Sequence, residues 1–82
     1  MSAIYYIDRD REGQPRDIIG PFASLEKARE NLSVGEEEIS VNAYDGVVAD
    51  LEQRHHGANA RLVEAWAAEC ESDADCIYEV TV

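Results

Sequence analysis

The last seven residues of the chain, CIYEVTV, constrain the fold most strongly because their polarity alternates with a period of two. One face of the strand that they predict would hold Cys76, Tyr78, Val80 and Val82. A strand with one apolar face is stable only when other strands pair with it and a further layer covers it. The chain therefore has to build a sheet.

Three other segments favour strands of that sheet. AIYYIDRD and DIIGPF, over 3–10 and 17–22, are rich in Ile and Tyr. Between them Gly13 and Pro15 favour a turn, so these two strands are predicted to form a hairpin with a loop longer than two residues. Over 39–44, Ile39, Val41 and Ala43 alternate with Ser40, Asn42 and Tyr44, and this alternation predicts a third strand.

A first helix is predicted after the hairpin. Ser24 occupies the position of an N-cap, and Leu25, Ala28 and Leu32 recur at helical spacing. Gly35 is expected to end this helix near residue 33.

A second helix is predicted between the third strand and the last one. Asp45 and Gly46 could turn a hairpin, but Asp45 as a helix cap is the preferred interpretation. On a helix, one face from residue 51 to residue 70 would hold Leu51, His55, Ala58, Leu62, Trp66 and Cys70. Gly57 is the weak point, where this helix over 51–70 could break.

The predicted order is thus β-β-α-β-α-β in a single domain over residues 1–82. It corresponds to an α+β fold with one mixed sheet, covered by two helices on one face. A chain of 82 residues buries only about 60% of its unfolded surface, so its core is small. A homodimer that shares one core is therefore an alternative to a monomer.

The net charge of −11 is concentrated in the second part of the sequence. Residues 1–29 hold five acids and five bases, whereas residues 30–82 hold 13 acids and two bases. This excess opposes binding to nucleic acids and to anionic membranes, and it favours basic partners. Solubility alone would also explain it.

The predicted topology brings two acidic clusters together. If the third and fourth strands are parallel neighbours, the residues that lead into them lie at the same rim of the sheet. We expect this rim to bind a partner through Glu36, Glu37, Glu38, Glu69, Glu71, Asp73 and Asp75. Arg9, Arg11 and Arg16 in the first hairpin could reach the same rim and partly neutralise it.

No metal, cofactor or catalytic centre is predicted. Glu71, Asp73 and Asp75 alternate like the start of an EF-hand loop, but neither the required Gly nor the final Glu follows. The spacing of Cys70 and Cys76, and the adjacent His55 and His56, do not fit a structural zinc site. A Cys–His pair is a weak candidate for catalysis, because an acidic environment suppresses the thiolate.

Two states are open for Cys70 and Cys76. A disulfide would close a short loop and contribute about 2 kcal/mol. Reduced thiols on core faces are the other state, and a cytosolic setting favours them. The cytoplasm is the expected location, because neither a signal peptide nor a membrane span is recognisable.

The small size, the 18 acids against seven bases, and the clusters GEEE and ECESDAD resemble the small acidic anti-CRISPR proteins of phages. This resemblance implies that the partner is a bacterial CRISPR effector and that binding blocks its access to target DNA. The residues themselves predict a non-enzymatic inhibitor that binds a basic, nucleic-acid-handling surface. The alternative is a homodimeric structural or accessory domain whose charge provides only solubility.

Overall fold

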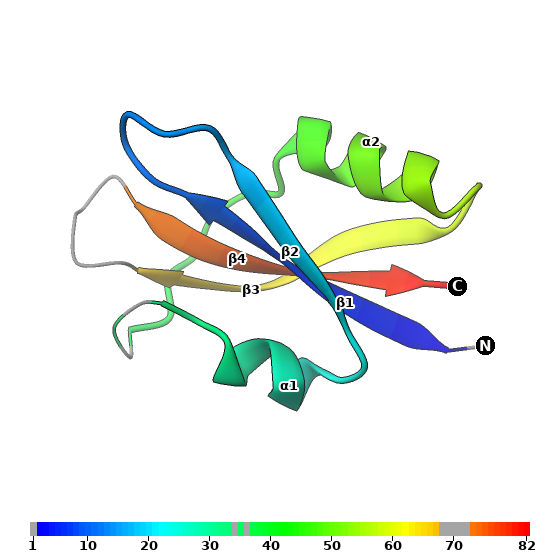
Figure 1. Cartoon of the computed structure of the whole chain (residues 1–82), viewed down its shortest axis with the longest axis horizontal. Helices are drawn as coiled ribbons and strands as arrows, with labels where there is room; N and C mark the ends of the chain where they lie inside the picture. The colour runs from blue at the N-terminus through cyan, green and yellow to red at the C-terminus, as the bar shows by residue number, and fades with distance from the viewer. Residues whose placement is uncertain (1, 34, 36, 68–72) are drawn as a thin grey trace.

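The computed structural model describes residues 2–33, 35, 37–67 and 73–82. It contains a four-stranded sheet and two helices, which Figure 1 shows on either side of the strands. The elements are β1 (Ala3–Asp10), β2 (Asp17–Phe22), α1 (Leu25–Glu30), α2 (Asp45–Arg54), β3 (Asn59–Ala67) and β4 (Ala74–Thr81). The fold is therefore α+β, as expected, but its order is β-β-α-α-β-β.

The strands lie in the order β2-β1-β4-β3, and every neighbouring pair is antiparallel. The expected mixed sheet was thus wrong. The N-terminal and C-terminal strands form the centre of the sheet, where Tyr6 pairs with Tyr78 and Ile7 with Ile77. The two N-terminal strands and their hairpin have the predicted bounds, and the last strand starts two residues earlier than predicted, at Ala74.

The strand predicted over 39–44 does not form. The isolated bridge between Glu38 and Trp66 lies just before this segment. The Ile39 N–H donates to the Ala65 carbonyl at 2.8 Å. Residues 40–44, which lead to α2, are not part of a strand. The polarity of residues 39–44 alternates as in a strand, but most of their backbone groups have no partner strand. Because a strand is stable only when its backbone groups are paired, the segment does not form one.

The second helix forms, but its predicted continuation to Cys70 was wrong, since α2 ends at Arg54 and residues 59–67 form β3. His56 and Gly57 both have positive φ, +46° and +90°, which ends the helix and turns the chain. A bulge between Leu62 and Glu64 explains the helical pattern. Leu62 packs on the face of the sheet that α2 covers, but Trp66 packs on the face that α1 covers. The extra residue of the bulge therefore interrupts the two-residue alternation that would have indicated a strand.

The two helices cover opposite faces of the sheet instead of one face. Figure 1 shows α1 and α2 on opposite sides of the strands. Val47 and Leu51 of α2 pack on Tyr6, Tyr78 and Val80. On the other face, Ala28 of α1 packs on Ile7 and Ile77. The reason is that β1 and β4 bury consecutive residues, which point to opposite faces, so both faces need a cover.

The helix starts follow the predicted chemistry only in part. The Ser24 hydroxyl accepts a hydrogen bond from the Lys27 N–H at 3.2 Å and is the N-cap of α1, as predicted. This helix ends at Glu30, before the predicted boundary. For α2 the preferred helix is confirmed, but Tyr44 holds the N-cap position, and Asp45 lies in the first turn.

Candidate functional site

The candidate site lies at the end of the sheet where β1 leads into the β1–β2 loop and β4 begins. We call it the hairpin end and define it by residues 10–17, 37–38, 65–67 and 73–75. These segments lie together because Asp10 and Ala67 both pair with Ala74, and because the Glu12 N–H donates to Asp73 Oδ1 at 2.8 Å. In Figure 1 this end is on the left, where the β1–β2 loop projects.

Glu37 and Glu38 reach the hairpin end by antiparallel pairing, not by the parallel β-α-β unit that the sequence predicted. The Ala67 N–H donates to the Glu37 carbonyl at 3.0 Å, and Glu38 forms its bridge with Trp66. Both acidic residues are exposed. Since Trp66 pairs in turn with Asp75, this acidic segment is two strand spacings, about 10 Å, from the start of β4.

Asp73 and Asp75 differ sharply in their surroundings. Asp73 is half-buried beside the β1–β2 loop. Asp75 has 0% exposure, and its carboxylate contacts Arg9 at 3.1 Å and Arg11 at 2.9 Å. The expectation that hairpin arginines reach this rim is confirmed for these two. The Asp75 charge is therefore neutralised inside the protein and is not presented to a partner.

Four of the residues proposed from sequence lie outside the described residues, namely Glu36, Glu69, Cys70 and Glu71. The predicted disulfide between Cys70 and Cys76 involves one of these residues and therefore also lies outside the described part of the chain. Cys76 itself is a free, half-buried cysteine. Burial, together with the negative charge of Asp8, raises the pKa of the Cys76 thiol to about 11. Cys76 therefore remains a neutral thiol at physiological pH.

His55 does not approach Cys76 as a catalytic base would. Its Nε2 lies 2.8 Å from the Tyr6 hydroxyl, at the C-terminus of α2. Cys76 instead pairs across the sheet with Asp8 and Ala65. Among the described residues, no group of three or more His, Cys, Asp or Glu side chains is placed to hold a metal ion.

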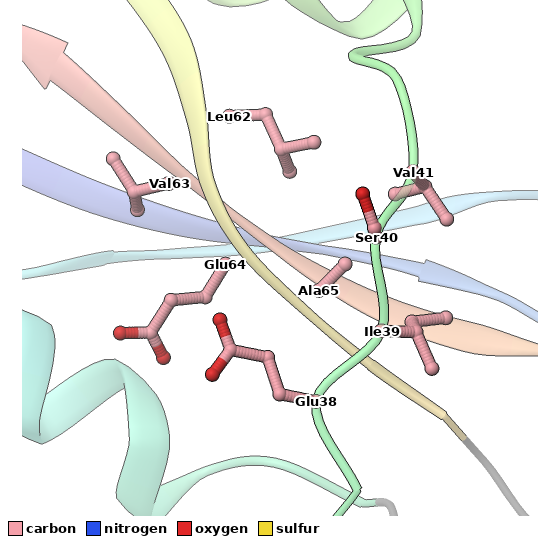
Figure 2. A pocket seen from close by; sticks show the side chains of 8 residues that line it. All are labelled: Glu38, Ile39, Ser40, Val41, Leu62, Val63, Glu64 and Ala65. Carbon is pink, nitrogen blue, oxygen red and sulfur yellow. The ribbon is translucent and has the colours of Figure 1, made fainter.

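A groove of about 500 Å³ runs between β3 and residues 38–41 (Figure 2). Glu38 and Glu64 lie at one end of it, and Val41 and Leu62 line the other. Arg29 of α1 forms an ion pair with Glu64, and its hydrogen bonds lower the pKa of that carboxyl group. β3 is an edge strand, so the groove lies at the edge of the sheet, and Glu38 and Glu64 make one end of the groove acidic.

The ion pairs explain where the net charge resides. Each of the seven bases forms an ion pair with a carboxylate of the same chain. The matched carboxylates are Asp8, Asp10, Glu30, Asp50, Glu64, Asp75 and Glu79, of which Asp8 and Asp10 share Arg16 and Asp75 binds both Arg9 and Arg11. Among the described residues, the acids that belong to none of these ion pairs include Asp17, Glu26, Glu37, Glu38, Asp45, Glu52 and Asp73.

Four of these acids, Asp17, Glu37, Glu38 and Asp73, belong to the hairpin end as the structure describes it. No basic side chain is left over from the internal pairs to neutralise them. This end of the sheet therefore carries a negative field directed toward solvent.

No protein-family model matches the chain, and no curated protein or solved structure shows significant similarity to it. None of the helices in the described ranges has the length and apolar character that crossing a bilayer requires. The site therefore has to be interpreted from its own geometry.

Sequence reasoning missed a second acidic group beside the rim, made of Asp8, Asp10 and Arg16. Arg16 Nη1 lies 2.6 Å from Asp8 Oδ2, and Arg16 Nη2 lies 3.2 Å from Asp10 Oδ2. The signal was present in AIYYIDRD, where Asp8 continues the face of the strand that carries Ile4 and Tyr6. A carboxylate on an apolar strand face is a candidate functional group.

Proposed function

We propose that this protein is a non-enzymatic acidic inhibitor that occupies the basic surface by which another protein handles nucleic acid. The observation that supports this most directly is the internal pairing of all seven bases. It leaves an excess of carboxylates to interact with a partner. Exposed carboxylates can occupy the Lys and Arg side chains that would otherwise neutralise phosphates.

The surface that would make this contact is the hairpin end. Glu37 and Glu38 lie on one side of it, and Asp73 lies on the other, about two strand spacings away. The backbone of Glu37 and Glu38 is paired with β3, and the Asp73 carboxylate accepts the Glu12 N–H, so the folded chain limits where these charges can lie before binding. A pre-organised row of charges loses less conformational entropy on binding than a flexible acidic tail does.

A bacterial CRISPR effector, as the resemblance implies, has a surface of the required kind, because it binds nucleic acid through a basic channel. The inhibitor would act in the bacterial cytoplasm and exclude target DNA by competition. Electrostatic complementarity of this type mainly accelerates association, and it weakens steeply as salt is added.

The alternative is an accessory homodimer whose charge serves only solubility. The groove and the part of β3 before Ala65, which residues 35–39 do not pair with, favour this function, because an open strand edge can pair with a second copy. Analytical ultracentrifugation distinguishes the two functions. A dimer that persists in high salt supports the accessory domain, whereas a monomer supports the inhibitor.

Two charge-reversal variants with the same net charge test the proposed surface. The first carries Glu37→Lys, Glu38→Lys and Asp73→Lys. The matched control carries Glu26→Lys, Asp45→Lys and Glu52→Lys, three acids in the helices and outside the hairpin end. Asp75 is left intact, because its reversal would disrupt the internal ion pairs.

The assay is retention of effector subunits from a CRISPR-bearing lysate in a salt gradient, followed by DNA competition with the retained complex. We expect the hairpin-end variant to lose the complex at low salt, and the control to keep it and to block DNA. Equal retention by both variants, or undiminished DNA binding in the presence of the native chain, would refute the proposal.

A further inference from the structure

A pocket of about 240 Å³ lies on the α2 face of the sheet, near the hairpin end. Its floor is formed by β1 and β4 through Asp8, Cys76 and Tyr78, and residues 39–44 form a wall. It differs from the edge groove beside β3, although Ile39 and Val41 line both. The pocket is larger than a chain of five non-hydrogen atoms, which needs about 150 Å³ at roughly 30 Å³ per atom.

The charges around this pocket are mainly negative. Asp8, Asp10 and Asp73 contribute three carboxylates, and Arg16 contributes one guanidinium group. Arg9 and Arg11 form ion pairs with Asp75 instead. Asp75 lies on the opposite face of the sheet, because it is next to Cys76 along β4 and Cys76 pairs with Asp8. The lining therefore has an excess of two negative charges, and it favours a cation.

Asp8 provides the observation that points to a ligand. Its exposure is 1%, and Arg16 binds only its Oδ2 oxygen. The buried Oδ1 has no hydrogen-bond partner among the described residues. A buried carboxylate oxygen without a donor is costly, and such a group in a native protein calls for an explanation.

Arg16 shows which chemistry the site already accepts. Its guanidinium group binds Asp8 and Asp10 and lies 4.0 Å from the centroid of the Tyr44 ring. One aromatic face and two carboxylates thus hold a cation that belongs to the chain itself. The Asp8 Oδ1 oxygen and the Asp73 carboxylate remain for a second cation.

We propose that this pocket binds the ammonium or guanidinium head of an unbranched alkyl chain, with Asp8 Oδ1 as the principal acceptor. Asp73 adds a second negative charge, and Ile39 and Val41 contact the methylene groups. Such a group is carried by free small amines and by the Lys or Arg side chains of proteins. The inference does not rest on the proposed inhibition, because it concerns a pocket that small probes can test alone.

The first test titrates n-butylammonium chloride into the protein, with NaCl at equal ionic strength and 1-butanol as controls. Backbone amide shifts in the NMR spectrum report binding. We expect saturable shifts at Ala74, Cys76 and Tyr78, with an affinity in the millimolar range, for butylammonium alone. The absence of saturation, or equal shifts with 1-butanol, would overturn the proposal.

A matched pair of variants locates the acceptor. Asp8→Asn removes the buried charge and keeps the side-chain shape, whereas Asp17→Asn removes an exposed charge from β2. We expect Asp8→Asn to weaken butylammonium binding by about tenfold, the value of one hydrogen bond to a charged group. Asp17→Asn should change it less than about twofold. Equal affinity of both variants would contradict the role of Asp8.

A second measurement does not depend on the Asp8 variant. In a Cys70→Ser background, the reaction of Cys76 with iodoacetamide should slow in the presence of butylammonium, because Cys76 lines the same pocket. A rate that does not respond to butylammonium would count against the pocket. A lysine peptide blocked at both termini then identifies the source. Shifts at the same amides indicate a partner's side chain, and shifts with butylammonium alone indicate a free amine.

Discussion

Arg9 and Asp75 are direct register partners on the central strands β1 and β4, and their side chains also form an ion pair at 3.1 Å. The same carboxylate accepts a hydrogen bond from the Ser33 N–H at 3.0 Å. Arg9 Nη2 donates to the Asn31 carbonyl at 2.9 Å. One buried carboxylate therefore ties two strands to the segment that follows α1.

Replacing this buried carboxylate should destabilise the protein more than replacing the half-buried Asp73 next to it. We expect Asp75→Asn to lower the free energy of unfolding by about 3 kcal/mol, because it leaves two guanidinium groups without their counterion. Urea denaturation measures the change, and Asp73→Asn is the control, with an expected loss of less than about 1 kcal/mol. Comparable losses in the two variants would show that the internal pair is not structural.

In contrast to Asp75, the charged carboxylate of Asp8 should lower the free energy of unfolding. Burial raises its pKa, against the lowering effect of Arg16. The folded state therefore holds this proton more tightly than the unfolded chain does. Between the ordinary value of 3.8 and the raised folded value, the unfolding free energy contributed by Asp8 falls as the pH rises.

Asp8→Asn should consequently raise the unfolding free energy at pH 7, by about 1 kcal/mol. It should also remove the corresponding part of the pH dependence. Thermal unfolding between pH 3.5 and pH 7 tests both effects. If the variant is less stable than the native chain at pH 7, the ion pair with Arg16 outweighs burial, and the predicted sign is wrong.

Gly20 should tolerate no side chain. Its φ is +143°, and an added Cβ would lie 2.9 Å from the Tyr5 carbonyl oxygen, a backbone atom that cannot move away cheaply. We expect Gly20→Ala to cost at least about 2 kcal/mol. Gly13, with φ of +77° and no atom near its Cβ position, is the matched control, and Gly13→Ala should cost about 1 kcal/mol. Calorimetry compares the two variants, and equal losses would refute the steric explanation.

The thiol of Cys76 should react slowly at neutral pH. Its pKa rises from 9.0 to about 11, so the thiolate fraction at pH 7 is about 100-fold lower than for an ordinary cysteine. Alkylation rates in the Cys70→Ser variant, measured from pH 7 to pH 11 against a cysteine peptide, test this. A rate that levels off near pH 9 would contradict the predicted environment.

The sequence predicted the terminal strands and the Ser24 cap because these features depend on neighbouring residues. Alternation in CIYEVTV and breakers at Gly13 and Pro15 are local signals. The third strand and the long second helix were wrong for reasons that are not local. Residues 39–44 alternate but lack a partner strand, and the bulge between Leu62 and Glu64 shifts the parity of β3.

The candidate site shows the same division. The sequence by itself determined the negative charge and its clusters, because these depend only on residue types. Tertiary structure decided which carboxylates face solvent. It buried Asp75 between two arginines and Asp8 beneath Arg16, and it brought Glu37 and Glu38 to the hairpin end through the antiparallel edge of β3. The physical reason is that desolvation and ion pairing depend on distances in space, which strand order and register set and which residue spacing along the chain does not contain.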